Sequence, residues 1–280
     1  MNNHCTICGA QSILEGNIDE ANLYRCPSCS HCFTEIDSIS VHEEYNEGYF
    51  EQDHRNWFNH PNLPLFEKLA NIINKDKPKG SVVDLGCGNG DFLKFLRKSN
   101  PSLSLTGIDL IMNKEVKGIH FISGNILETE IDKQYDVIVS LAVIEHVTDL
   151  KLFMQRVCDI CRPGGLIIIM TLNDSGLLYR LARLMRNWGV TTPYRRLYSK
   201  HHVNHFNIAS LRCLAELNRL NVINILKHDT VISAIDVPSS SRFAGPMLKA
   251  AVAGIFCISK VSGQTYLQTI ICRKGFVRQD

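Results

Sequence analysis

The stretch VVDLGCGNG, from Val82 to Gly90, lies between a predicted buried strand and a predicted amphipathic helix. Glycines at such a junction let the backbone turn tightly and let a ligand approach the main chain closely. The dinucleotide fingerprint has the spacing Gly-x-Gly-x-x-Gly, whereas this loop has one residue fewer before its third glycine and an aspartate two positions before its first. The loop therefore predicts an open α/β fold with a ligand at the end of the first strand, and its spacing disfavours a pyrophosphate site.

Outward from this loop, short apolar runs alternate with stretches of helical periodicity. That alternation is typical of a doubly wound α/β sheet with right-handed crossovers. We predict helices near residues 90–98, 150–161 and 208–219, and one more that precedes the sheet, over PLFEKLANIINK. The predicted strands are SVVDL, LSLTGID, IHFIS, YDVIVSL, LIIIMTL and, with weaker patterns, VINILKH and TYLQTIICR.

Composition and charge limit the kinds of protein this can be. The chain has 280 residues, of which 45% are apolar and 21% charged, as in an ordinary globular protein. Its net charge of +2 does not favour a nucleic-acid partner. The start, MNNHCTICGA, lacks the basic and apolar pattern of a secretory signal, so we expect a cytoplasmic protein, with contact at the membrane periphery left open.

Four of the eleven cysteines form two pairs, Cys5-x-x-Cys8 and Cys26-x-x-Cys29, separated by seventeen residues. This spacing is typical of a tetrahedral zinc site with four thiolate ligands. Four protein ligands close the coordination shell, so we predict a structural Zn²⁺ that stabilises a segment too small for its own core. Cys32 is an alternative ligand, but the spacing favours Cys29.

These features predict three parts of the chain. Residues 1–36 form a zinc ribbon, residues 37–79 a linker with an N-terminal helix, and residues 80–280 the α/β domain. Two segments, 173–206 and 237–263, are predicted insertions in that domain. Long insertions of this kind are often lids or binding loops.

Over roughly residues 60–235, the chain resembles the class I S-adenosylmethionine-dependent methyltransferases, whose Rossmann-like domain begins with Asp-x-Gly-x-Gly-x-Gly. The resemblance implies S-adenosylmethionine as cofactor. It places Gly86, Gly88 and Gly90 along the methionine and ribose, Asp84 near the loop or the cofactor's ammonium group, and Asp109 on the ribose hydroxyls. Asn125, in SGNI, falls beside adenine, where an aspartate is more usual. Leu110, Ile126 and Leu141 complete the predicted cofactor-binding set.

The triplet Glu145-His146-Val147 resembles a branch that includes ubiquinone-biosynthesis O-methyltransferases and polysaccharide-cluster methyltransferases. A neutral imidazole at His146 is suited to take a proton from an attacking hydroxyl. In the alternative interpretation His146 only packs at the strand end and Glu145 caps the next helix. The same branch often has His-x-x-x-Phe where this chain has His202 and Phe206, so we predict that His202 faces the acceptor.

The two insertions allow further interpretations. Arginines at helical spacing (180, 183 and 186), followed by Arg195 and Arg196, indicate either a phosphate site or a solvated helix face packed by its leucines. The apolar stretch from Met247 to Val261 is shorter than the ~20 residues of a spanning helix. Together they could dock on a membrane surface, or they form a dimer interface or a lid.

The sequence therefore predicts a methyltransferase that acts on a small or lipid-linked acceptor, with a sugar hydroxyl of polysaccharide or glycolipid biosynthesis as the first choice. Three alternatives remain open at this point. The first is a ribosomal-RNA guanine methyltransferase, because one such family also carries an N-terminal cysteine module. The others are a sugar C-methyltransferase and a non-catalytic zinc-ribbon interaction protein. A homodimer is also left open.

Overall fold

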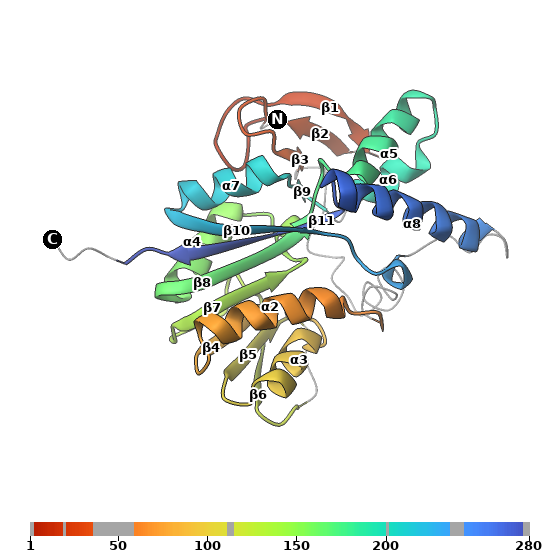
Figure 1. Cartoon of the computed structure of the whole chain (residues 1–280). Coiled ribbons are helices and arrows are strands. Elements are labelled where there is room, and N and C mark those ends of the chain that lie inside the picture. The colour runs from red at the N-terminus through yellow and green to blue at the C-terminus, as the bar shows by residue number, and fades with distance from the viewer. Residues whose placement is uncertain are drawn as a thin grey trace.

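The computed structural model of the chain describes residues 3–18, 21–35, 59–110, 115–199, 202–235 and 244–276. Its elements form two sheets, a seven-stranded one with the order β10-β11-β8-β7-β4-β5-β6 and a four-stranded one with the order β1-β2-β3-β9 (Figure 1). Parts of the predicted linker (residues 37–58) and of the second insertion (237–243), together with His201, lie outside the described residues.

Five strands of the large sheet are parallel, as predicted: β4 (Ser81–Leu85), β5 (Ser104–Asp109), β6 (Ile119–Ser123), β7 (Tyr135–Leu141) and β8 (Cys161–Leu172). The last strand, β11 (Leu267–Lys274), is antiparallel to both β8 and β10 (Leu220–His228). The strand order changes direction beside β4, so the glycine loop after β4 opens at the place where such sheets bind their ligands.

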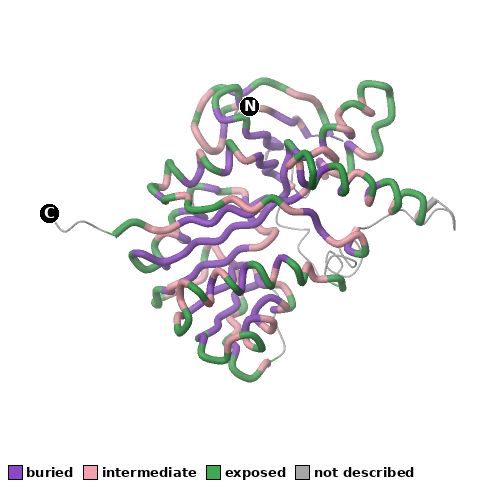
Figure 2. The backbone as a smooth tube through the Cα atoms, viewed as in Figure 1, coloured by how far each residue is buried: buried purple, intermediate pink, exposed green. Residues whose placement is uncertain are grey.

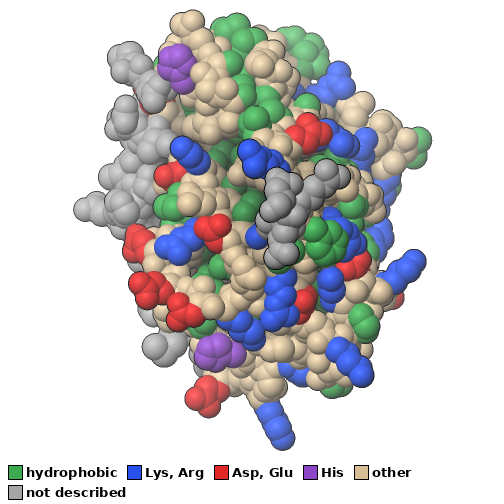
Figure 3. Space-filling model, turned by 90° about the vertical axis from the view of Figure 1, so that its left-hand side faces the viewer, with side chains coloured by type: hydrophobic (Ala, Val, Ile, Leu, Met, Phe, Trp, Pro, Cys, Tyr) green, Lys and Arg blue, Asp and Glu red, His purple; other side chains and the backbone are tan. Residues whose placement is uncertain are grey.

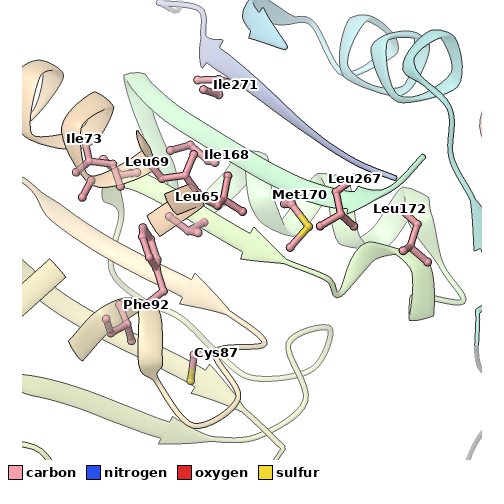
Figure 4. Close-up of a cluster of buried hydrophobic side chains, with 14 of the residues drawn as sticks. Leu65, Leu69, Ile73, Cys87, Phe92, Ile168, Met170, Leu172, Leu267 and Ile271 are labelled. Atoms are coloured by element: carbon pink, nitrogen blue, oxygen red, sulfur yellow. The ribbon is translucent and has the colours of Figure 1, made fainter. Parts of the chain in front are cut away.

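Side chains of the strands alternate between the two faces of this sheet, and apolar side chains lie on both faces. Helices therefore cover both faces. Val82 and Ile168 pack on one side in a core cluster with α2 (Leu63–Asp76) and α3 (Asp91–Ser99). Figure 4 shows Leu65, Leu69 and Ile73 of α2 above these strands. Val83 and Ile169 face the opposite cluster, which includes residues of α4 (Leu150–Ile160) and α7 (Ile208–Leu217).

The predicted helices are correct apart from their ends. The helix expected from residue 90 begins at Asp91, since Gly90 has a left-handed φ of 73°. The helix expected to reach residue 161 stops at Ile160 because Cys161 already begins β8. The helix expected to reach residue 219 ends at Leu217, where Asn218 is its C-cap and Arg219 has a φ of 56°.

The N-terminal segment forms a small antiparallel sheet of β1 (Ile13–Ile18), β2 (Ala21–Arg25) and β3 (Cys32–Thr34). Its fourth strand, β9 (Asn204–His205), belongs to the first insertion and pairs Cys32 with His205. Thr34 N–H also donates to Val203 O at 2.9 Å. Figure 1 shows this sheet at the end of the molecule that α7 and α5 border. The ribbon is therefore attached through backbone hydrogen bonds to the segment that contains His202.

The insertions are mainly helical. The first contains α5 (Leu177–Asn187) and α6 (Thr192–Leu197) before β9. The second contains α8 (Ala244–Ser262). Two short 3₁₀ helices, η3 (Ile144–His146) and η4 (Ile232–Ala234), follow β7 and β10. The interpretation of α5 as a simple solvated face is wrong for Arg183, because its guanidinium turns inward to bind the buried Asp174 at 2.9 Å.

Candidate functional site

The glycine loop after β4 is held in a conformation that only glycine adopts easily. Gly86 and Gly90 both have a φ of 73°, and Gly88 has a φ of 51°. A Cβ atom on Gly86 would lie 2.4 Å from Cγ2 of Val143, so a side chain there would clash as well as strain the backbone. The loop therefore brings its backbone close to the chain that follows β7.

The loop is fixed to the end of the neighbouring strand β5. The N–H groups of Gly86 and Cys87 both donate to the carbonyl of Ile108, at 2.8 and 3.1 Å. Gly88 N–H donates to Oδ2 of Asp109 at 2.8 Å. Asp109, predicted to bind ribose hydroxyls, thus also orders the loop.

Asp84 lies beneath the loop with its carboxyl group buried. Burial and the neighbouring charge of Asp109 raise the pKa of Asp84 to about 8. Its Oδ1 atom has no hydrogen-bond partner among the described residues. A buried oxygen left in this state costs stability unless a ligand pairs with it. The site therefore fits a ligand that offers a cationic or hydrogen-bond-donating group to Asp84, as the ammonium group of S-adenosylmethionine does.

A pocket opens above this acid at the carboxyl ends of the strands. Four residues predicted to bind the cofactor line it, namely Asp84, Gly86, Gly88 and Leu141. The other lining residues come from the loop, the starts of α2 and α3 with the residues before α2, the ends of β8 and β11, and the residues after β10: His60, Pro61, Asn62, Leu65, Phe66, Cys87, Asn89, Asp91, Phe92, Met170, Thr230 and Leu267. Figure 4 shows Met170 and Leu267 beside each other at this end of the sheet.

Five predicted cofactor residues are not among those that line the pocket: Gly90, Asp109, Leu110, Asn125 and Ile126. The Asn125 side chain serves its own turn, since it accepts from Leu127 N–H at 3.0 Å and donates to Glu128 at 2.9 Å. Leu110 is exposed, and Ile126 packs against the core. The roles of these residues toward adenine and ribose remain predictions.

Sequence reasoning missed the contribution of α2. Asn62 caps this helix by accepting from Leu65 N–H at 3.2 Å, and its Nδ2 donates to Asp229 O at 3.1 Å. The Asn-x-Pro pattern before Leu65 is a helix-start signal that could have been found. Nothing local in the sequence shows that this helix end borders the glycine loop.

His146 and His202, the two predicted catalytic residues, lie together. Their ring centroids are 4.8 Å apart, with an angle of 59° between the ring planes. His146 ends η3, directly after the strand that carries Leu141, and His202 precedes β9. Two segments separated by more than fifty residues thus bring a pair of imidazoles together after β7. The last residue of this strand, Leu141, lines the pocket, whereas neither histidine is among the lining residues.

Glu145 does not cap the next helix, so that interpretation is wrong. The cap of α4 is Asp149, whose side chain accepts from Leu152 N–H at 2.8 Å. Glu145 is instead buried, and its Oε2 accepts the hydroxyl of Thr171 at 2.8 Å. Burial raises its pKa to about 7. Its backbone carbonyl accepts from Val203 N–H at 2.9 Å, which joins η3 to the His202 segment.

His205 has a different environment from His202. It is buried, its Nε2 lies 3.2 Å from Oγ1 of Thr34, and burial lowers its pKa to about 4. Its ring centroid is 6.5 Å from that of His202. These contacts are those of a packing residue between the ribbon and the α/β domain.

The sulfur atoms of Cys5, Cys8, Cys26 and Cys29 all lie within 4.8 Å of one another. Two pairs, Cys5–Cys29 and Cys8–Cys26, are each 3.5 Å apart. A tetrahedral Zn²⁺ with bonds of about 2.3 Å places its sulfurs about 3.8 Å apart, so the donor set fits this ion. Cys32, the alternative ligand, lies outside the cluster and contacts Glu15.

Comparison with known proteins supports the assignment of the glycine loop and its sheet to a methyltransferase domain. Residues 51–225, more than half of the chain, match the family described as methyltransferase domain. A ubiquinone biosynthesis O-methyltransferase of Rickettsia akari is 28% identical over 163 residues, which cover 50% of this chain and 64% of that protein. The corresponding protein of Rickettsia conorii is 32% identical over 140 residues, 45% of this chain and 46% of that protein. The chain therefore spans less than two thirds of these relatives.

Solved structures share the fold at low sequence identity. A SAM-dependent methyltransferase from Archaeoglobus fulgidus aligns with a TM-score of 0.53 and 18% identity, over 81% of this chain and 99% of that one. The Burkholderia thailandensis 1,6-didemethyltoxoflavin-N1-methyltransferase aligns with a TM-score of 0.56 and 11% identity, over 95% and 100%. From the family match, the strand order and the loop geometry, the chain belongs to the class I S-adenosylmethionine-dependent methyltransferases.

Proposed function

We propose that this protein transfers a methyl group from S-adenosylmethionine to a hydroxyl group of a lipid-linked acceptor. The observation that carries the proposal is the pair His146 and His202, with ring centroids 4.8 Å apart at the strand end that borders the cofactor pocket. A neutral imidazole can accept the proton that a hydroxyl group loses when its oxygen attacks a methyl group.

The residues that would hold the cofactor are those of the pocket. The glycine loop lies along it, Asp84 offers its unsatisfied Oδ1 to the ammonium group, and Asp109 lies at the end of β5. The bound cofactor supplies an electrophilic methyl group on a sulfonium ion. The chain's task is then to hold the acceptor oxygen in line with that group and to receive the proton, which makes positioning a large part of catalysis.

The choice of acceptor rests on the relatives and on the chemistry of the pair. The two Rickettsia relatives are named ubiquinone biosynthesis O-methyltransferases, which favours a hydroxyl oxygen over a carbon or a guanine nitrogen. Nothing in the comparisons supports polysaccharide biosynthesis. A phenolic hydroxyl on a prenylated ring and a sugar hydroxyl on a lipid carrier share the same reacting group, so the proposal concerns the lipid-linked hydroxyl.

The proposal includes a structural Zn²⁺ bound by Cys5, Cys8, Cys26 and Cys29. Its support is the close approach of four sulfur atoms in a segment with a small core of its own. The ion would stabilise the turn between the end of β2 and the start of β3. It would thereby also stabilise the pairing of β3 with β9. Catalysis by the metal is not part of the proposal, because four thiolates leave no open position.

The test is a methyl-transfer assay with S-adenosylmethionine labelled in its methyl group. Acceptors in separate reactions are a prenylated catechol, an isoprenoid-linked sugar and ribosomal RNA. Label in an ether of either lipid acceptor supports the proposal, and the two arms distinguish the phenol from the sugar. Label in RNA or on carbon, or no turnover of either lipid acceptor by protein that binds S-adenosylmethionine, would overturn it.

A further inference from the structure

Helix α8 is attached to the body of the protein along a narrow stripe. Its buried residues include Val252, Phe256 and Ser259, which recur at intervals of four and three. Phe256 stacks on Tyr266 at 5.9 Å, and the hydroxyl of Ser259 donates to Asp229 at 2.9 Å. Of the window Gly245–Ser262, only 17% is buried, and Figure 2 shows most of α8 as exposed.

The exposed side of α8 is apolar. Met247 is 73% exposed and Val261 is 92% exposed, and Leu248 and Ile258 are exposed as well. A helix that lies on a water-facing surface ordinarily turns polar side chains outward. Among the described residues, α8 is the one helix whose length and composition would suit a membrane. A contiguous apolar surface of this kind marks an interaction site.

The end of α5 carries further exposed apolar side chains. Leu184 and Val190 are exposed, and Trp188 is 76% exposed. The start of α5 is joined to the segment that follows α8, because Arg180 donates to the side chain of Gln264 at 2.8 Å. Figure 1 shows α8 beside α5 and α6. The α5–α8 surface is defined here by its exposed apolar residues Leu184, Trp188, Val190, Met247, Leu248, Ile258 and Val261.

Among the described residues of α5, α6 and α8, all charged side chains are basic. The sequence has no Asp or Glu from residue 175 to 215, nor from 244 to 276. Arg180 and Lys260 are exposed beside the apolar residues, and Lys249 is half-buried. The face at the other end of the sheet, seen in Figure 3, carries acidic and basic side chains together. The α5–α8 surface is therefore complementary to an anionic partner.

We propose that the α5–α8 surface binds an anionic lipid bilayer, with α8 lying in the interface and its apolar side turned to the acyl chains. Basic residues at the edge of an apolar helix face, together with an exposed tryptophan, are the features that hold a helix in this position. Anionic headgroups attract each nearby lysine or arginine.

Two other occupants fit the surface less well. A second copy in a two-fold contact would bring Arg180 and Lys260 near like charges of its partner, with no acid among the described residues of α5 and α8 to compensate. A helix that crosses the bilayer is disfavoured by topology, because β10 and β11 on either side of α8 pair with each other. If α8 crossed the bilayer, the chain would have to cross it again to bring β10 and β11 together. That second crossing would not be helical, and its backbone groups would lack hydrogen-bond partners in the lipid.

The surface lies beside the cofactor pocket. Asp229, which binds Ser259 of α8, also accepts from Tyr266 N–H at 2.8 Å. The residues that follow these two in the chain, Thr230 and Leu267, line the pocket. Binding at the membrane therefore places the methyl-transfer site next to lipid, although the inference stands on α8 and α5 and does not depend on catalysis.

The test is co-sedimentation of the full chain with vesicles of phosphatidylcholine alone and of phosphatidylcholine mixed with phosphatidylglycerol. We expect binding to the mixed vesicles and little to the neutral ones. The double variant Ile258→Asp and Val261→Asp should lose binding at least about tenfold, and Lys249→Gln with Lys260→Gln about fivefold for each lysine removed. Leu217→Asp, on the exposed side of α7, is the matched control and should bind as the unaltered chain does.

Two further measurements separate the possible outcomes. Trp188 emission should shift to the blue with mixed vesicles, and Trp188→Phe should remove that shift. Calorimetry with S-adenosylmethionine shows whether each variant is folded. Equal binding to both vesicle types, no binding, or no effect of the α8 variants would overturn the proposal, as would a dimer in sedimentation velocity that the same variants dissociate. Failure of the methyl-transfer assay would leave vesicle binding unchanged.

Discussion

Nη1 of Arg25, in the N-terminal ribbon, donates to Oδ2 of Asp174, in the first insertion, at 2.8 Å. Asp174 is almost fully buried, and Arg183 and Tyr198 bind its other oxygen. Burial alone would raise the pKa of Asp174, but the charges of Arg25 and Arg183 hold it below its ordinary value. The buried carboxylate of Asp174 thus joins the ribbon to the segment that follows β8.

Replacing Arg25 with Met should destabilise the protein by about 2 kcal/mol, because a hydrogen bond to a buried charge is lost. Arg162→Met is the control, since Arg162 makes an ion pair with Asp136 at the same distance of 2.8 Å but is 47% exposed. An exposed pair contributes about 0–1 kcal/mol. Urea unfolding measures both variants, and equal losses would contradict the structural role given to Arg25.

The metal prediction concerns one Zn²⁺ for each chain. Metal analysis should find it in the unaltered protein and in Cys32→Ala, and should not find it in Cys29→Ser, because Cys32 lies outside the sulfur cluster. A chelator should increase hydrogen exchange in β3 and β9, which pair with each other. Binding of S-adenosylmethionine should survive, since the glycine loop belongs to the other sheet. Loss of zinc from Cys32→Ala would assign the ligands differently.

The central sheet could be predicted from sequence because its signals are local. The loop at Val82–Gly90 and the buried strands around it carry their own periodicity, and the large sheet has the predicted strands. The pocket could be predicted only in part. Met170 and Leu267 reach it because β8 and β11 pair across nearly a hundred residues, and no local pattern contains that pairing.

The roles of His146 and Glu145 show the same limit. Each histidine of the pair carries a recognisable motif, but their contact depends on β9 joining the ribbon sheet and on the bond from Val203 to Glu145. In the sequence, the position of Glu145 before a helix indicates a helix cap. Burial against Thr171, which comes from a strand, decides its role instead.

The raised pKa of Asp84 predicts that cofactor binding releases a proton. With a pKa of about 8, this carboxyl group is mostly protonated at pH 7. A bound ammonium group favours the ionised form, so the proton leaves, up to about one for each cofactor bound. Calorimetry in two buffers of different ionisation enthalpy should show a buffer-dependent heat that disappears in Asp84→Asn. Asp91→Asn, at a second acid of the pocket, should keep it. A heat independent of buffer in the unaltered protein would remove Asp84 from this role.

The histidine pair predicts a selective loss of turnover. His146→Ala or His202→Ala should lower kcat by about 10²–10⁴, the usual contribution of a general base, and leave the affinity for S-adenosylmethionine unchanged. The variant that removes the base should also lose the acidic limb of the pH profile. His120→Ala, at an exposed position of β6, is the control. Unchanged kcat in both variants would show that the rings only pack together.

Glu145 predicts a pH dependence of stability that can be isolated with one substitution. Its pKa rises from 4.5 to about 7 on folding, mainly through burial. The folded protein therefore holds the proton more tightly than the unfolded chain. The contribution of Glu145 to stability is fully present below about pH 4.5 and is lost as the pH rises through 7, a change of up to about 3 kcal/mol.

Glu145→Gln keeps an oxygen for the hydroxyl of Thr171 but does not titrate, so it should lack this loss. Relative to the unaltered protein, the variant should gain up to about 3 kcal/mol between pH 5 and pH 8 in urea unfolding. Buried histidines such as His205 and His31, whose pKa values burial lowers, affect both proteins equally and cancel in the difference. Glu216→Gln, at an exposed position of α7, should show no such gain. A difference that stays constant across this range would mean that Glu145 remains ionised in the folded protein, which would require a cationic partner that its contact with Thr171 does not provide.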